Sequence, residues 1–410
     1  MNDPAAPAAA APAAASSSSD SGPRPGVRYS VPLHLYAILL GVCVFLLIGI
    51  GGTVTSTGAG MAVPDYPTTL GYNMFTVPLN EWLTGDARPD VFWEHFHRLM
   101  GSLVGVLTIG MVVWLTVAQR SRRWLVAAGW GLLLMVIIQG LMGGFRVTEE
   151  SIRLAMLHGI LGQLVLGCCV LIAAATSRPW VEAVTGPRAY AVHAEPGKVF
   201  GMRYVAGVLL LLLVVQLALG AWMRHNAAGL AVPDFPTAYG QVLPPLHQQG
   251  LAQTQAAWEV AHDQPLTRPY SVAQVSVHMA HRAGAAVVCA VALVLLVWVN
   301  VVAPGHRLTA WPARGLAALL ALQVMLGAYV IWSRRHVDIA TAHQAGGALL
   351  LALATLLTIR LNLLRYTGVG ETLPHKPSPE KRSAEGPDQS TRPGRSGASP
   401  SAQPSALMSR

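Results

Sequence analysis

Charged residues are scarce in this chain. Asp, Glu, Lys and Arg make up only 11% of its 410 residues, whereas hydrophobic residues make up 53%. Soluble globular domains carry about 25% charged residues, so this composition excludes a soluble protein and predicts that lipid surrounds most of the chain. The net charge of +9 is spread between apolar runs without a basic face or a recognition motif, which argues against a nucleic-acid partner.

Cysteine is also scarce, and its pattern predicts no site. The four cysteines lie within apolar runs and form no C-x-x-C pair, which argues against a disulfide framework or a zinc site and is typical of small buried side chains. The first 25 residues lack the apolar core of a cleaved signal peptide. We therefore expect residues 1–30 to form a disordered cytoplasmic tail, followed by an apolar run that itself directs insertion.

Eight apolar runs are long enough to cross a bilayer, which takes about 20 residues. They cover residues 31–52, 94–118, 124–143, 154–175, 203–223, 275–300, 313–332 and 340–364. Of the 28 Lys and Arg residues, 19 lie at the termini and in the even-numbered connections, which places both termini in the cytoplasm. We predict an all-α integral protein of the inner (cytoplasmic) membrane with eight transmembrane helices.

The chain contains an internal repeat. Gly60-Met-Ala-Val-Pro-Asp-Tyr-Pro-Thr68 returns as Gly229-Leu-Ala-Val-Pro-Asp-Phe-Pro-Thr237, with seven of nine positions identical. The pairs that match 184 or 185 residues apart are His97-Arg98 with His281-Arg282, Gln139 with Gln323, and His158 with His343. Each half holds four spans, so we expect two tandem four-helix bundles related by a pseudo-twofold axis along the membrane normal.

The repeat also suggests the domain boundaries. We expect the first four-helix half at 31–175, a cytoplasmic linker at 176–202 and the second four-helix half at 203–364. Residues 365–410, which are rich in Pro, Ser, Arg and Glu, should form a second disordered cytoplasmic tail.

Four of the fourteen histidines, His97, His158, His281 and His343, fall within apolar spans. Ionisable groups are costly there and usually mark function. In the predicted orientation all four lie some 6–9 Å below the outer boundary, at about 1.5 Å per residue. Two imidazoles at equal depth in one bundle can bind both faces of a haem iron. Two histidines per half fit this better than a tetrahedral zinc or copper site, so we predict one haem site in each half, toward the outer face.

Several neighbours of these histidines are candidates for supporting roles. Arg98 and Arg282 are candidates to pair with haem propionates or to extend to lipid phosphate. Asp65 and Asp234, each between two prolines, are expected to cap a rigid turn over the site. The glycines that follow the histidines allow either a haem or another helix to approach closely; they are Gly101, Gly105, Gly159, Gly162, Gly284, Gly346 and Gly347.

The two halves differ three residues before the first histidine of each pair, where Glu94 corresponds to His278. This position shares the helix face of the ligand, so Glu94 is a candidate to accept protons or stabilise a cationic intermediate. The alternative is an ion pair with Arg98. His278 is either an alternative ligand or a hydrogen-bond partner, and we expect His95 at the membrane interface.

These residues together resemble the haem A synthase family over about residues 35–364. The resemblance rests on Gly51-Gly-Thr-Val-Thr-Ser-Thr-Gly-Ala-Gly60, Val63-Pro-Asp-Tyr-Pro67, Glu94-x-x-His97-Arg98, His158, His281-Arg282 and His343. It implies an oxidoreductase that converts the C8 methyl group of haem O to a formyl group for cytochrome oxidase assembly. Some family members carry a cysteine pair in the first outer loop, and residues 53–93 here contain none.

The resemblance also implies roles for the candidate residues. His97 and His158 would hold haem O as substrate, and Glu94 would be the catalytic carboxylate. His281 and His343 would ligate a resident haem b that passes electrons. A haem O synthase (protohaem farnesyltransferase) would supply the substrate. The electron acceptor and the oligomeric state, including a homo-oligomer, stay open.

Two other functions fit an eight-span histidine protein. A bis-histidine dihaem transmembrane electron carrier would stack its haems at opposite membrane depths, whereas both pairs here are predicted in the outer layer. A transporter would have broken helices near the midplane, and the spans contain no matching Gly/Pro interruptions.

Overall fold

The computed structural model describes residues 28–83, 88–185, 191–263 and 265–367, and eight long helices make up most of this part. They are α1 (Val31–Ser56), α3 (Pro89–Ala118), α4 (Arg123–Thr148), α5 (Ile152–Thr176), α7 (Pro196–His225), α9 (Val272–Val302), α10 (Arg307–Trp332) and α11 (Val337–Leu363). Each is long and apolar enough to cross a membrane. The prediction of an all-α membrane protein with eight spans is therefore confirmed; the two predicted tails lie largely outside the described residues.

Most of these helices extend beyond the predicted apolar runs. For example, α3 begins at Pro89, where the fixed φ of proline suits a first turn, and α9 begins after a capping box made by Ser271 and Gln274. Hydropathy averaged over about 20 residues detects the segment that suits lipid and does not locate the first turn of a longer helix.

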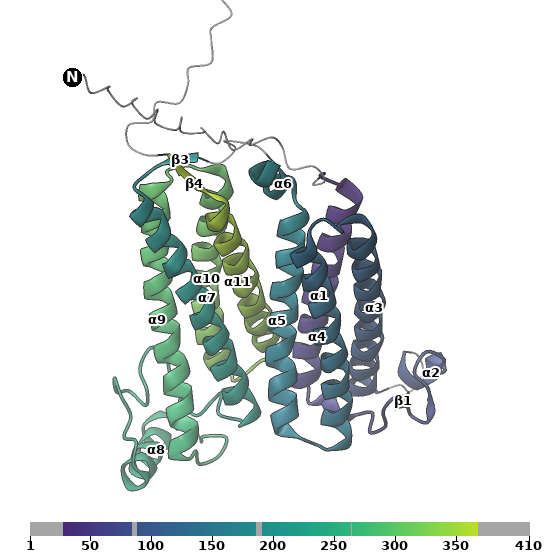
Figure 1. The fold of residues 1–410 in the computed structure, drawn as a ribbon. Coiled ribbons are helices and arrows are strands. Elements are labelled where there is room, and N and C mark those ends of the chain that lie inside the picture. The colour runs from purple at the N-terminus through teal and green to yellow at the C-terminus, as the bar shows by residue number, and fades with distance from the viewer. Residues whose placement is uncertain (1–27, 84–87, 186–190, 264, 368–410) are drawn as a thin grey trace, which may run out of the picture. The chain divides into compact units, whose positions relative to one another are not determined.

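The short elements lie in the connections. They are η1 (Ala59–Met61), β1 (Thr68–Thr69), β2 (Tyr72–Asn73), α2 (Leu79–Trp82), α6 (Arg178–Thr185), β3 (Ala191–His193), α8 (Gln248–His262) and β4 (Arg365–Thr367). Strands β1 and β2 pair antiparallel, and β3 pairs with β4 in parallel. Figure 1 shows α2 and α8 at the end of the long helices opposite to α6, β3 and β4. The sequence analysis did not predict α8.

The eight helices form two groups of four (Figure 1). In the first, α1 and α4 each pack against α3 and α5; in the second, α7 and α10 each pack against α9 and α11. Each group has its own buried apolar core. The groups meet where α1 contacts α11, α5 contacts α7, and α5 contacts α11. Helices α5 and α11 are equivalent in the repeat, and the contact of α1 with α11 corresponds to the contact of α7 with α5. The pseudo-twofold axis itself stays a prediction.

The four candidate histidines lie near one end of the helices. Each follows the first residue of its helix by six to nine residues, in α3, α5, α9 and α11. These four helices run in the same direction, so the fold brings the histidines to the end that carries the two long connections. Which side of the membrane this end faces stays a prediction.

Candidate functional site

The histidines form two pairs of equal geometry. The ring centres of His97 and His158 are 6.4 Å apart with planes at 68°, and those of His281 and His343 are 6.4 Å apart with planes at 72°. Two imidazoles on opposite sides of one metal, each bound at about 2 Å, have ring centres roughly 6 Å apart. Each pair therefore fits the two axial positions of a haem iron. Among the described residues, no three His, Cys, Asp or Glu side chains gather as a metal-binding group.

Each histidine ring lies against a glycine of a neighbouring helix. A Cβ atom built at Gly51, Gly143, Gly220 or Gly327 would lie only 3.0 to 3.2 Å from Cε1 of His97, His158, His281 or His343, respectively. A side chain at such a distance would displace the ring, so these glycines determine where the ring rests. The sequence analysis missed this role. The repeat spacing could have indicated it: Gly51 and Gly220 lie 169 residues apart, and Gly143 and Gly327 lie 184 apart.

The structure divides the glycines that follow the histidines into two sets, and close approach of a haem to them stays a prediction. Gly101, Gly105 and Gly159 face open space within the described structure. Gly162, Gly284 and Gly346 instead leave room for glutamine side chains from the preceding or neighbouring helix. The glutamine amides donate hydrogen bonds to the backbone carbonyls of the adjacent histidines.

Arg98 and Arg282 hold the repeated loops. The Arg98 guanidinium donates to the carbonyls of Val63 at 2.7 Å, Asp65 at 2.7 Å and Thr68 at 2.9 Å. In the second half, Arg282 donates to the carbonyls of Asp234 at 2.5 Å and Thr237 at 2.8 Å. Both guanidinium groups are thus bonded to loop backbone, and their pairing with haem propionates stays a prediction.

Asp65 and Asp234 cap a turn in each loop, as predicted. Asp65 accepts hydrogen bonds from the backbone N–H groups of Leu70 and Gly71, both at 2.9 Å. Asp234 does the same for Tyr239 at 2.6 Å and Gly240 at 2.8 Å. All four capped residues have positive φ, so the carboxylates stabilise backbone that would otherwise be strained. Burial opposes ionisation of Asp65, but its hydrogen bonds outweigh burial and lower its pKa.

Glu94 and His278 anchor the same point of the two loops. The Glu94 carboxylate accepts a hydrogen bond from the N–H of Val63 at 3.0 Å and forms an ion pair with Arg98 at 2.9 Å. His278 accepts from the N–H of Val232 at 3.3 Å through Nδ1. Both side chains are buried. The structure therefore contains the Arg98 ion pair that sequence left as an alternative, and it gives His278 a hydrogen-bonding role.

The structure buries His95, while its expected place at the membrane interface stays a prediction. His95 is only 1% exposed, its Nδ1 lies 3.3 Å from the hydroxyl of Thr69, and its ring meets Trp82 edge-on. The residue lies under the first long loop because β1 and α2 fold back over the start of α3. Hydropathy could not reveal this, since the covering residues lie at least 13 positions away along the chain.

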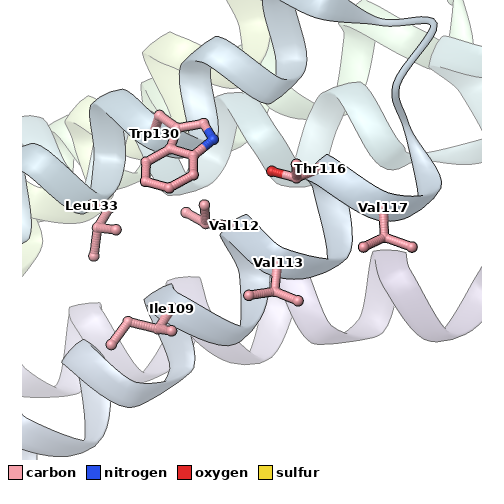
Figure 2. A pocket seen from close by; sticks show the side chains of 7 residues that line it. All are labelled: Ile109, Val112, Val113, Thr116, Val117, Trp130 and Leu133. Carbon is pink, nitrogen blue, oxygen red and sulfur yellow. The ribbon is translucent and has the colours of Figure 1, made fainter.

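A separate apolar pocket lies between α3 and α4 (Figure 2). It is lined by Ile109, Val112, Val113, Thr116, Val117, Trp130 and Leu133. Ile109 follows His97 by twelve residues, which corresponds to about 18 Å along a helix. The pocket is therefore remote from the histidines.

The chain matches known proteins over both histidine pairs. The sequence model of a family described as cytochrome oxidase assembly protein matches residues 34–355. A haem A synthase of Methylorubrum populi is 28% identical over 363 residues, covering 81% of this chain and 86% of the relative. Haem A synthases of Methylorubrum extorquens (27% over 365 residues, 81% and 86% covered) and Bartonella bacilliformis (22% over 353 residues, 80% and 91% covered) are also similar.

Proposed function

We propose that this chain, which belongs to the haem A synthase family of cytochrome oxidase assembly proteins, is an oxidoreductase. In the proposed reaction it oxidises the C8 methyl group of haem O to a formyl group. The observation that carries the proposal is the difference between two histidine pairs of equal geometry. Both have ring centres 6.4 Å apart, but a buried carboxylate lies beside the first pair and an imidazole stands in its place beside the second.

The first pair is assigned to the substrate. His97 and His158 hold haem O, and Glu94 lies one helical turn before His97. Conversion of a methyl to a formyl group removes electrons and protons from the carbon and takes an oxygen atom from water. A fixed negative charge in a site with little water stabilises the positive charge that develops on the carbon before water adds. The bonds from Val63 and Arg98 hold the Glu94 carboxylate in place for this role.

The second pair is assigned to a resident cofactor. His281 and His343 are the residues that would hold haem b, and bound haem b supplies a one-electron carrier for electrons that leave the substrate. Gly220 and Gly327 position the two imidazoles for ligation. His278 provides no negative charge at the position that Glu94 occupies in the first half.

The location follows from the same premises. We place the chain in the inner (cytoplasmic) membrane, with both termini in the cytoplasm and both histidine pairs toward the outer face. A haem O synthase that attaches the isoprenoid tail would supply the substrate through the bilayer, because such a tail partitions into lipid.

The test is expression of the full chain in a host that makes haem O but not haem A, followed by pigment extraction and mass analysis. We expect haem A to appear, and we expect His97→Ala to prevent its formation while the protein still accumulates. If haem O persists unchanged although the wild-type protein is present and loaded with haem, the synthase proposal fails. The dihaem electron carrier would give that result.

A further inference from the structure

Three of the four candidate ligand histidines are held by a glutamine from a neighbouring helix. The side-chain amide of Gln139 donates to the carbonyl of His158 at 2.8 Å, and that of Gln323 donates to the carbonyl of His343 at 2.6 Å. Gln216 donates to the carbonyl of His281 at 2.8 Å, and its Nε2 also lies 3.1 Å from Nδ1 of the same ring.

Each glutamine has a glycine opposite it that makes room for its side chain. A Cβ atom built at Gly284 or Gly346 would overlap the side-chain oxygen of Gln216 or Gln323. At Gly162 the added Cβ would lie 3.2 Å from Nε2 of Gln139. Each support therefore consists of one glutamine, one glycine about a turn beyond the histidine, and the histidine carbonyl.

His97 is the exception. In the second half, Gln216 precedes Gly220 by four residues. The residue that precedes Gly51, the glycine in contact with the His97 ring, by four is Leu47. Met100 occupies the position that corresponds to Gly284. Within the described part of the chain, His97 accepts no side-chain hydrogen bond at its carbonyl, which distinguishes it from the other three; its Nδ1 is buried without a partner, as is that of His343.

We propose that the three glutamines are positioning residues that lock their histidines onto haem, and that His97, which lacks this support, is the ligand that yields when haem enters or leaves the first half. The assignment of the exchanging haem to the first half rests on the proposed function. Outer partners of metal ligands typically change metal affinity by about 10- to 100-fold. In a lipid-surrounded bundle, interhelical hydrogen bonds of this kind also fix the helix that carries the ligand.

The consequence is a division of labour that suits a synthase. Substrate must bind and product must leave the first half in every cycle, whereas the cofactor of the second half must stay. A half with two supported ligands retains its haem, whereas a half with one supported ligand releases it more readily, because dissociation begins at His97 and leaves His158 as the last bond to break.

The test follows the release of haem from the purified, haem-loaded full chain to an excess of apomyoglobin, read by absorbance. We expect a fast phase from the first half and a slow phase from the second. Gln216→Leu should accelerate the slow phase by about 10-fold. The double substitution Leu47→Gln with Met100→Gly, which introduces the missing support, should slow the fast phase by a similar factor.

The controls separate positioning from damage to the fold. Gln163→Leu removes a buried glutamine of α5 for which no hydrogen bond to a histidine is present among the described residues, and it should change neither rate. Loss of native packing exposes a bound haem and speeds its release, so slower release from the gain-of-support variant with an unchanged absorption spectrum is opposite to the effect of such damage. The inference is overturned if Gln216→Leu leaves the slow phase unchanged or if the double variant fails to slow the fast phase. Release rates do not depend on formyl production, so failure of the synthase proposal would be seen separately.

Discussion

The two halves of this protein share their ligand geometry and differ in the residues that surround it. Both place two imidazoles 6.4 Å apart between parallel helices, and both clamp a Val-Pro-Asp loop with an arginine. The halves diverge where Glu94 corresponds to His278. Because a carboxylate and an imidazole accept the same backbone N–H, anchoring the loop does not require a negative charge. The charge of Glu94 is paired with Arg98, and its role in chemistry stays part of the proposed function.

The largest expected effect comes from removing a ligand. His281→Ala should eliminate the haem b spectrum of the second half, because one imidazole cannot replace a pair. Absorption spectra of the purified protein, normalised to protein content, measure this. His262→Ala, at an exposed histidine of α8, is the matched control and should leave the spectrum unchanged. An unaltered spectrum in His281→Ala would exclude His281 as a haem ligand, and with it the prediction that each half binds haem through a histidine pair.

The comparison is sharpest at Glu94. Glu94→His introduces into the first half the residue type that the second half has at this position. The imidazole can still accept a hydrogen bond from the N–H of Val63, but the negative charge is lost. We expect conversion of haem O to fall by about 10²- to 10³-fold, with haem binding retained. Mass analysis of extracted pigment and the absorption spectrum measure these two quantities. Normal conversion in this variant would assign Glu94 to loop anchoring alone.

A smaller effect is expected at the glycines on which the histidines rest, and it should be equal in the two halves. Gly51→Ala and Gly220→Ala each place a Cβ about 3 Å from an imidazole carbon, so we expect haem release to apomyoglobin to accelerate about 10-fold. Gly49→Ala and Gly207→Ala, which face open space on the same helices, are the controls. Equal rates in test and control variants would contradict the proposed seating of the rings.

The smallest effect concerns the pH dependence of the first loop. The pKa of Asp65 is lowered in the folded protein, so its stabilising contribution is full above the unfolded pKa of about 3.9 and is lost as pH falls through the folded value. At about pH 6, Asp65→Asn should speed amide hydrogen exchange at Leu70 and Gly71 by roughly two- to ten-fold. The ratio of mutant to wild-type exchange rates should approach unity as pH falls below the folded pKa of Asp65. A ratio that does not change with pH would exclude the carboxylate as the cap.

The sequence allowed prediction of the spans, the repeat and the four histidines because each is a local pattern. Hydropathy over about 20 residues identifies a membrane helix, and a histidine within such a run stands out without knowledge of its neighbours. The burial of His95 could not be predicted, for the complementary reason. Its burial depends on Thr69 and Trp82, which reach it only after the loop folds back.

The sequence by itself determined that this is a duplicated membrane protein with a histidine pair in each half, and that a carboxylate precedes the first histidine by three residues in only one of the halves. Only the tertiary structure decided what holds those histidines: glycines of neighbouring helices against the rings, and glutamine amides on three of the four backbone carbonyls. The physical reason is that these contacts cross between helices. Their partners are determined by how the helices pack and rotate against one another, and the pattern along one helix does not specify that.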